Sequence, residues 1–335
     1  MNKTVTGQPH DLYSYHSLHS LAKKFYSTFI LLLIFCSNDL QAQRTDSLPG
    51  GGQQKNGVVP MPDSMYGARP VYKINTLRSG IFSIVATAAN LYAIPTIIHG
   101  KRDMTDAELD ALNPLSPNSI ERWALKQNPA NRESFSKASD IALPTIIFSA
   151  AALGFDKHIR KDWAKLLLMY YEMHAFTFAL YDFSPFGPAF QNKLRPVTYY
   201  TYFPREERLR GNNRNSLYSG HVASAAASTF FMAKVYSDYH PEIGNKRFLL
   251  YGLASLPPLV EGYLRVKALA HFPSDVVVGF VIGAVCGIGL PEMHRKKAQS
   301  LRFGLYSNGE SNGLKLAWNF TKKQKALNEP VCLRK

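Results

Sequence analysis

A short stretch between two apolar segments carries three residues that could act together on a phosphate group. Arg265, His271 and Asp275 stand at fixed spacing where one apolar segment ends and the next begins. An arginine can bind phosphoryl oxygens through two N–H groups, and an imidazole that is oriented by a carboxylate can attack phosphorus. The stretch therefore predicts half of a phosphate-processing site, with His271 as the nucleophile and Asp275 as the group that holds one nitrogen of its ring.

Two further clusters could supply the other half of this site. Ser219, Gly220 and His221 open an apolar segment, where a serine hydroxyl and the free amides that follow it would face an anion at a helix N-terminus. Gly220 has no side chain to block that approach, and His221 could protonate a leaving oxygen. Lys193 and Arg195 lie upstream of this cluster and would add positive charge around a phosphate.

Six apolar segments must position these clusters, and they predict an all-α fold. None of them shows the period-two alternation of a strand, and several contain runs of small residues that suit close helix packing. In an up-and-down bundle, the ends of the third and fifth segments and the starts of the fourth and sixth share one face. The three clusters would therefore meet at that face. The segments span residues 77–99, 138–155, 163–181, 221–236, 248–264 and 276–291.

Helix-start signals refine this pattern. Residues 101–137 suggest two short amphipathic helices, one starting after Thr105 or Asp106 and the other after Ser119. Pro273 fits the first turn of the sixth helix, which places Asp275 in the same turn.

The flanks of the bundle divide into three parts. Residues 1–42 resemble an export signal, because two lysines precede a short apolar run and a small-residue exit. Residues 43–76 are rich in Gly, Pro, Ser and Gln and predict a disordered linker to the helical domain at 77–292. Residues 293–335 form a basic tail with a β-hairpin signal. Apolar residues alternate on both sides of a turn expected at 308–309 or 312–313.

Composition limits the partners. The 335 residues are 46% hydrophobic and carry a formal net charge of +15, which suits a phosphorylated substrate or an anionic membrane surface. The basic residues form no stripe interleaved with aromatics, which disfavours nucleic acid. Three cysteines show neither metal-ligand spacing nor a disulfide framework. We expect no metal site and see no sign of an obligate protein partner.

The clusters resemble the motifs of the type 2 phosphatidic acid phosphatase (PAP2) superfamily, which shares its site with vanadium haloperoxidases and class A acid phosphatases. That family carries a lysine followed seven residues later by Arg-Pro, then Ser-Gly-His, then Arg-x5-His-x3-Asp. Arg195-Pro196, residues 219–221 and residues 265–275 match these motifs. The resemblance covers about residues 181–291 and implies a six-helix PAP2-like bundle that is membrane-embedded or membrane-associated.

The resemblance also implies roles. His271 would become a phosphohistidine, Asp275 would support it, and His221 would act first as an acid and then as the base for water. Phosphate would be held by five residues, with no metal or cofactor, and vanadate would mimic it. The five are Lys193, Arg195, Ser219, Gly220 and Arg265.

The chain departs from the family pattern at three positions. Pro188 stands where the first motif has lysine, and Lys193 could supply the missing charge from two residues before Arg195. Tyr218 stands where proline is usual, and Leu264 where serine is common.

The expected function is metal-independent hydrolysis of a phosphomonoester or pyrophosphate. A lipid substrate is favoured because the body is apolar: phosphatidate, polyprenyl pyrophosphate, lipid A or phosphatidylglycerol phosphate. The alternatives are a soluble periplasmic acid phosphatase, a vanadium-dependent haloperoxidase and a non-catalytic membrane-associated relative.

The expected location is the cell envelope, either exported or in the inner membrane, with the site facing the periplasm. Only residues 79–100 offer a charge-free run long enough to cross a bilayer easily. Asp140 and Glu172 lie inside apolar segments, where acids are functional if the segment spans a membrane and ordinary surface residues if it does not. We assign no role to either from sequence.

Overall fold

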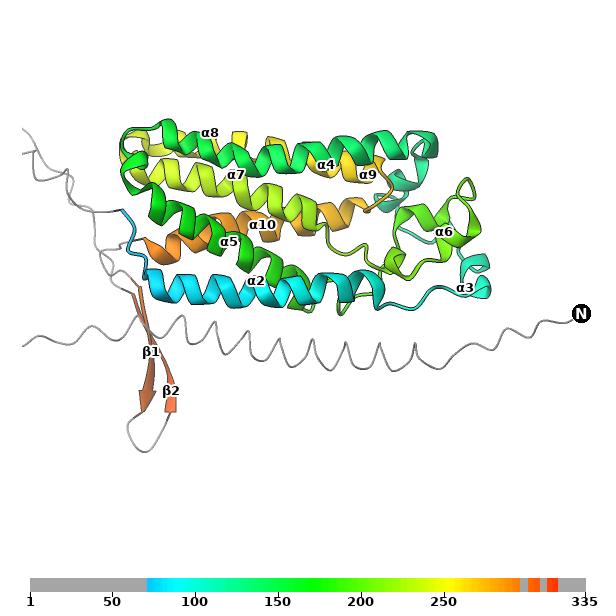
Figure 1. The fold of residues 1–335 in the computed structure, drawn as a ribbon, viewed down its shortest axis with the longest axis horizontal. Helices are drawn as coiled ribbons and strands as arrows, with labels where there is room; N and C mark the ends of the chain where they lie inside the picture. The colour runs from blue at the N-terminus through cyan, green and yellow to red at the C-terminus, as the bar shows by residue number, and fades with distance from the viewer. Residues whose placement is uncertain (1–70, 296–300, 308–311, 319–335) are drawn as a thin grey trace, which may run out of the picture. The chain divides into compact units, whose positions relative to one another are not determined.

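The computed structural model describes residues 71–295, 301–307 and 312–318. The predicted leader at 1–42 and almost all of the predicted linker lie outside these residues. The helical part and the hairpin are treated separately below, each by its own contacts (Figure 1).

The helical part confirms the all-α prediction (Figure 1). The fifth apolar segment is two helices, not one, with Ser255 at the junction. Pro257 and Pro258 explain the break, because a proline has no N–H for the preceding turn. The long elements are α2 (Thr76–His99), α4 (Arg132–Phe148, continued by the 3-10 helix Ser149–Phe155), α5 (Trp163–Phe183), α7 (Gly220–Tyr239), α8 (Arg247–Ala254), α9 (Leu256–Lys267) and α10 (Pro273–His294).

One of the two predicted short helices is confirmed. The α3 helix (Asp106–Asp110) begins after Thr105, whose side chain accepts from the Glu108 amide in a capping box. The second prediction is partly wrong: Glu121–Lys126 is a 3-10 helix, and Asn118, not Ser119, accepts from its first amide. The remaining short elements are Pro129–Asn131, Ile159–Asp162, Pro196–Tyr199, α6 (Arg205–Leu209), Gly211–Arg214 and Pro241–Lys246.

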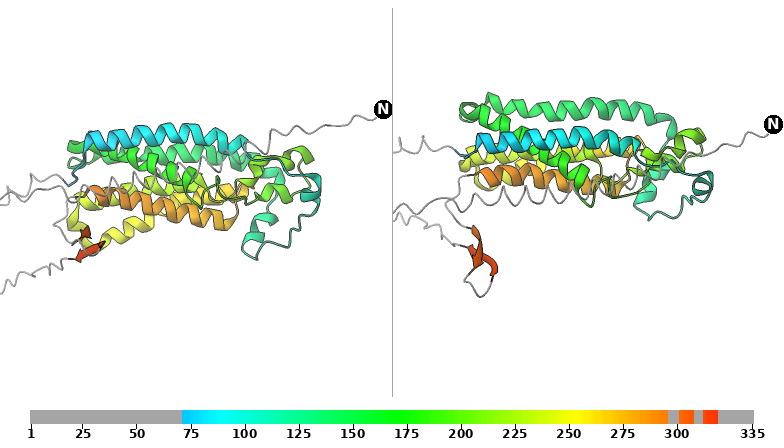
Figure 2. Two further views of the ribbon diagram at one scale, coloured as in Figure 1. Left: turned by 90° about the horizontal axis from the view of Figure 1, so that it is seen from below. Right: turned by 60° about the horizontal axis from the view of Figure 1, so that its bottom comes forward.

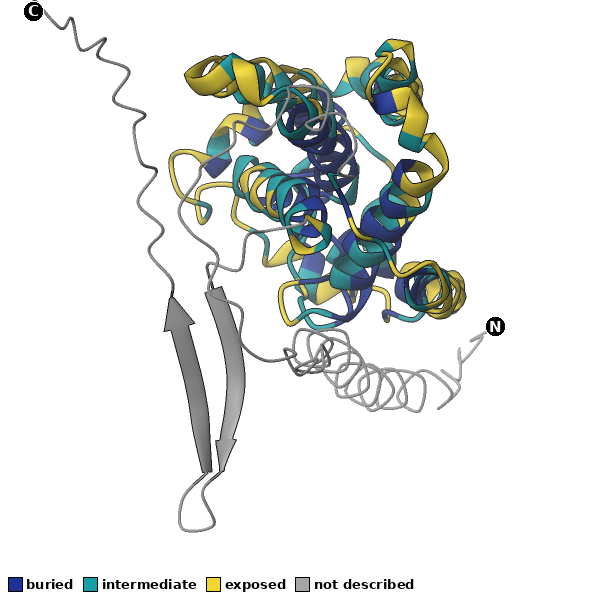
Figure 3. Cartoon of the chain, turned by 90° about the vertical axis from the view of Figure 1, so that its left-hand side faces the viewer, coloured by how far each residue is buried: buried dark blue, intermediate teal, exposed yellow. Residues whose placement is uncertain are grey.

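The α7 helix runs through the middle of the bundle, and its run of small residues lets neighbouring helices approach it closely. Ala223, Ala226 and Ala227 are fully buried, as the predicted small-residue packing requires. Figure 3 shows buried residues gathered in the interior and exposed residues on the outward faces. A cluster of large side chains joins α5, α7 and α10: Leu166, Met169, Met173, Phe231, Val235, Cys286 and Leu290.

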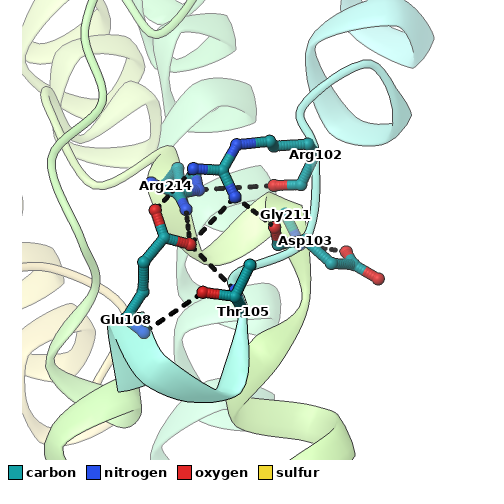
Figure 4. A network of polar contacts seen from close by, with 6 residues as sticks. All are labelled: Arg102, Asp103, Thr105, Glu108, Gly211 and Arg214. Carbon is teal, nitrogen blue, oxygen red and sulfur yellow. Dashed lines mark hydrogen bonds and ion pairs between the residues drawn. The ribbon is translucent and has the colours of Figure 1, made fainter. Parts of the chain in front are cut away.

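The short helices α3 and α6 lie at one end of the bundle, beyond the ends of α2 and α9 (Figures 1 and 2). A polar network fastens the chain after α2 to the segment that leads into α7 (Figure 4). The Glu108 carboxylate accepts from Arg102 (2.9 Å) and Arg214 (3.0 Å), and the Asp103 carboxylate accepts from the Gly211 amide (2.6 Å). This network fixes the chain immediately before residues 215–219.

Among the residues that the structure describes, three helices are long and apolar enough to cross a membrane: Thr76–His99, Pro129–Phe155 and Pro273–His294. The sequence pointed only to the first of them as a charge-free span. Large apolar side chains on their outward faces are exposed, among them Leu91, Phe148 and Val285. These faces indicate association with a membrane.

The hairpin prediction is confirmed. Strand β1 (Leu301–Ser307) pairs antiparallel with β2 (Asn312–Trp318), with Leu301 opposite Trp318 and Ser307 opposite Asn312. Asn312 and Gly313 therefore belong to β2, and the prediction of a turn at 312–313 is wrong. The other predicted turn position lies outside the described residues.

Candidate active site

The three sequence clusters meet at the end of the bundle where α3 and α6 lie. Arg265 lies in the last turn of α9, and Ser219 is the N-cap of α7. His271 lies in the loop between α9 and α10, and Arg195 immediately precedes the 3-10 helix Pro196–Tyr199. The charges of Arg265, Arg195 and His221 all lower the pKa of His271, so the four side chains lie within electrostatic range of one another.

His271 is buried, with 2% of its surface exposed. Its Nδ1 atom lies 2.7 Å from the main-chain carbonyl oxygen of Ser216. A carbonyl oxygen only accepts, so Nδ1 carries the hydrogen and Nε2 keeps its lone pair. The pKa of His271 lies well below the usual value, because burial and the charges of Arg265 and Arg195 disfavour its protonated form. A neutral imidazole with a free Nε2 is the form that can attack phosphorus.

The turn between α9 and α10, which positions His271, is fixed by the conformation of Leu269 and by a main-chain hydrogen bond. Leu269 has φ of 54°, the left-handed conformation, and is fully buried. Its carbonyl oxygen accepts from the Val197 amide at 3.2 Å, which ties the turn to the segment after Arg195. The chain therefore reverses between α9 and α10 at a position that neighbouring backbone enforces.

Asp275 supports His271 indirectly. Its carboxylate accepts from the Ser216 hydroxyl (2.5 Å) and from the Phe272 amide (2.9 Å), as expected for an acid in the first turn of α10. The prediction that Asp275 itself holds an imidazole nitrogen is corrected: Ser216 stands between them, binding Asp275 with its side chain and His271 with its carbonyl.

The Lys193 ammonium group lies close to the carboxylates of Asp275 and Glu121. Its ammonium lies 2.7 Å from Asp275 Oδ1, 2.7 Å from the Ser274 hydroxyl and 3.2 Å from Glu121 Oε1. Three partners match the three N–H donors of an ammonium group. This placement suits a lysine that stabilises the Asp275 carboxylate. Its predicted contact with phosphate stays a prediction.

Two arginine side chains present donors without partners. Within residues 71–295, the buried Nε atoms of Arg195 and Arg265 have no hydrogen-bond partner, and no carboxylate lies within ion-pair distance of Arg195. Burying guanidinium donors without an acceptor is costly, so such donors are normally matched by an anion. Both guanidinium groups thus keep a buried Nε donor without an acceptor, and the predicted contact of these arginines with phosphate stays a prediction.

The start of α7 has the predicted cap. The Ser219 side chain accepts from the Val222 amide (3.4 Å), and the Ser219 amide donates to the Asp275 carbonyl (3.1 Å). The Gly220 α-carbon faces the ring of Tyr181, where an added Cβ would lie 3.2 Å from Cε2. Packing against Tyr181 is therefore a further reason for glycine here.

A comparison with protein families finds one match. Residues 166–299 match the model of the PAP2 superfamily, and this range contains all eight predicted site residues. This match supports the predicted activity of a phosphoric ester hydrolase of the PAP2 type.

One solved structure is also similar, the crystal structure of the first transmembrane PAP2 type phosphatidylglycerolphosphate phosphatase from Bacillus subtilis. The two chains are 21% identical over an alignment that covers 64% of this chain and 93% of that one, with a TM-score of 0.35. No curated protein sequence matches the chain.

Two acidic residues that the sequence analysis did not assign to the site lie close to residues of the PAP2 motifs. Asp140 of α4 is 3.7 Å from His221 Nε2 and 4.0 Å from Arg265 Nη1. Glu261, one turn before Arg265, accepts from the Ser139 hydroxyl at 2.5 Å and is fully buried. Asp140 had a signal in the sequence, an acid in an apolar segment. Glu172 gave the same signal and instead pairs with His294 (2.9 Å).

A buried lysine also stands beside the PAP2 site. Lys101 follows α2 and donates to the main-chain oxygens of Gln191 and Arg214, with no carboxylate partner in the part of the chain that the structure describes. Burial and the charges of Arg214 and Arg195 lower the pKa of Lys101 to about 7. Lys101 thus places a second basic group near Arg195, in a region where Pro188 replaces the family lysine.

Proposed function

We propose that the PAP2 domain hydrolyses the phosphomonoester of a lipid through a phosphohistidine on His271. The observation that carries this proposal is the neutral His271 ring, with Nδ1 bound to Ser216 and Nε2 free, beside arginines whose buried Nε atoms lack partners.

In the proposed reaction, Arg195 and Arg265 bind the non-bridging oxygens of the phosphate and offset its charge as it is transferred. Nε2 of His271 attacks phosphorus and the ester P–O bond breaks. Burial and the charges of Arg265 and Arg195 lower the pKa of His221 to about 3, so His221 receives a proton from the bound phosphate monoanion and passes it to the leaving alkoxide. His221, now neutral, then takes a proton from water, and the hydroxide attacks the phosphohistidine. The products are the alcohol and inorganic phosphate, and His271 returns to its neutral form.

No step of this scheme needs a metal, because the arginines supply the positive charge. In the described ranges, no three His, Cys, Asp or Glu residues gather as a metal site. We propose that Ser219 and Gly220 help to hold the phosphate and that vanadate occupies the same place.

A lipid substrate is supported by the apolar outward faces of the three long helices, with a soluble phosphomonoester as the alternative. We further propose that the site faces the periplasm. Leu115 follows α3 and Phe248 lies in the first turn of α8, and both are exposed. Because α3 and α8 lie toward opposite ends of the bundle (Figure 1), single-cysteine variants at these two positions can test this. In intact cells, an impermeant maleimide should label Leu115→Cys and spare Phe248→Cys. The reverse pattern would place the site in the cytoplasm.

The test of the function is phosphate release by purified full-length protein from phosphatidate, polyprenyl pyrophosphate, lipid A, phosphatidylglycerol phosphate and soluble phosphomonoesters. We expect release from a lipid, unchanged by EDTA, inhibited by vanadate and abolished in His271→Ala. Activity that survives His271→Ala, or that EDTA removes, would contradict the mechanism. Vanadate-dependent bromide oxidation would identify a haloperoxidase, and vanadate binding without turnover would identify a non-catalytic relative.

A further inference from the structure

The site has a buried side and an exposed edge. Ser219 is fully buried, His271 is 2% exposed, and 9% of the Arg265 side chain is exposed. By contrast, 33% of the His221 side chain and 61% of the Asp140 side chain are exposed. Because attack and departure at phosphorus are roughly in line, a nucleophile on the buried side sends the leaving group toward the exposed edge. The leaving group therefore meets His221 and Asp140.

The position and the free oxygens of the Asp140 carboxylate allow it to contact that leaving group. Its carboxylate lies within 4.0 Å of both Arg265 and His221. These distances are ion-pair distances and too long for hydrogen bonds, and among the residues that the structure describes no group donates to Asp140. Its oxygens are therefore free to accept from a substrate.

The placement of Asp140 is unusual for its helix. It is the only charged residue between Lys137 and Asp156, in a segment apolar enough to cross a membrane. An exposed carboxylate on such a segment is costly, which marks it as a candidate for function. Close by, Glu261 keeps one carboxylate oxygen without a partner within residues 71–295, so a second acid reinforces the negative charge beside Arg265.

We propose that Asp140 selects the leaving group, in a proposal that rests on the function above. Its carboxylate favours an alcohol that carries a hydroxyl beside the ester oxygen, because a charged acceptor binds that hydroxyl strongly. It disfavours a leaving group that is itself a phosphate, because the two negative charges repel each other. The preferred substrates are phosphomonoesters of hydroxyl-bearing lipids, and pyrophosphates are disfavoured.

Three probes in the same detergent micelles separate these effects. Lysophosphatidate has a hydroxyl next to the phosphate-bearing carbon, phosphatidate has an ester there, and the leaving group of farnesyl pyrophosphate is a phosphate. For the full-length protein we expect kcat/KM to fall in that order. In Asp140→Asn, the ratio of kcat/KM for lysophosphatidate to kcat/KM for phosphatidate should fall about tenfold. The ratio of kcat/KM for farnesyl pyrophosphate to kcat/KM for phosphatidate should rise about tenfold.

Glu133→Gln is the matched control. Glu133 lies on the same helix, pairs with Lys137 and is 79% exposed, so the variant removes one negative charge away from the site. Its substrate preferences should equal those of the unmodified protein. Asp140→Ser serves as a second variant, because a neutral side chain of another shape should give the same shift if charge is the cause.

The outcomes distinguish this inference from the function it rests on. The inference is overturned if Asp140→Asn changes kcat/KM by the same factor on all three substrates. It is also overturned if Glu133→Gln shifts the substrate preference as much as Asp140→Asn does. Both outcomes leave the phosphatase function intact. Absence of phosphate release from every probe, or release that persists in His271→Ala, overturns the function itself and the inference with it.

Discussion

The Nδ1 atom of His271 lies 2.7 Å from the main-chain carbonyl oxygen of Ser216. A main-chain acceptor cannot be removed by a side-chain substitution, so the orientation of the imidazole does not depend on one neighbouring side chain. The Ser216 hydroxyl makes the second connection, to Asp275 at 2.5 Å. The two roles of Ser216 can therefore be separated by mutation.

Ser216→Ala should weaken the enzyme without inactivating it. The variant loses the hydrogen bond to Asp275, which costs about 1–3 kcal/mol, and keeps the carbonyl that holds His271. We expect about a tenfold fall in kcat, measured by phosphate release, and a lower midpoint of thermal unfolding. His271→Gln, which removes the nucleophile, should be inactive. A Ser216→Ala enzyme as inactive as His271→Gln would show that the carbonyl alone does not orient the ring.

Lys193→Met tests whether this lysine serves the phosphate or Asp275. Since its ammonium contacts Asp275, Ser274 and Glu121, we expect kcat and thermal stability to fall while the vanadate inhibition constant changes less than about threefold. Arg195→Lys is the comparison, because losing the planar guanidinium should raise that constant about tenfold or more. The reverse pattern would establish Lys193 as a phosphate ligand.

The sequence predicted the parts of the site that follow from topology. Alternating helix direction brings the ends of α5 and α9 to the starts of α7 and α10, and residue spacing alone places Arg265, His271 and Asp275 at that end. The break between α8 and α9 was not predicted, although the prolines at 257–258 are a local signal for it. These features depend on chain direction and local backbone chemistry, both of which are legible in one sequence.

The contacts within the site were not predictable in the same way. That Asp140 meets His221 depends on the rotation of α4 about its own axis, which an apolar segment exposed on most sides does not specify. Ser216 holds His271 with its main-chain carbonyl oxygen, and because every residue has such an oxygen, the sequence does not reveal this contact. The contacts of Lys193 with Asp275, Ser274 and Glu121 could not be predicted either, because a lysine side chain can extend in several directions from one backbone position.

The protonation state of His271 can be measured directly. Burial and the charges of Arg265 and Arg195 lower its pKa, so lowering the pH through 6.5 should leave this ring neutral. In nitrogen-labelled protein, the histidine signals lost in His271→Gln should still show the tautomer with hydrogen on Nδ1 below pH 6.5. Half-protonation near 6.5 would mean that neither burial nor the charges of the arginines lower the pKa of His271. Addition of vanadate, which brings negative charge, should raise this pKa.

The contact of α10 with α7 positions Ser219 and Asp275 relative to each other and depends on glycines. A Cβ at Gly283 would collide with the main-chain oxygen of Ala223, one turn into α7, and a Cβ at Gly279 would meet the Ser219 carbonyl oxygen. Neither backbone atom can move aside without separating the helices. Gly283→Ala should therefore lower the free energy of unfolding by about 1–3 kcal/mol, and Gly279→Ala should also reduce kcat.

Gly289→Ala is the control within the same helix, because no atom lies within 4 Å of its added Cβ. With no collision, the better helix propensity of alanine should stabilise the protein by about 0.5–1 kcal/mol. Thermal unfolding in detergent and phosphate release measure both effects. Equal stability of Gly283→Ala and Gly289→Ala would show that the two helices are farther apart than the close backbone contact implies. A normal kcat in Gly279→Ala would show that the start of α7 tolerates displacement without loss of the site.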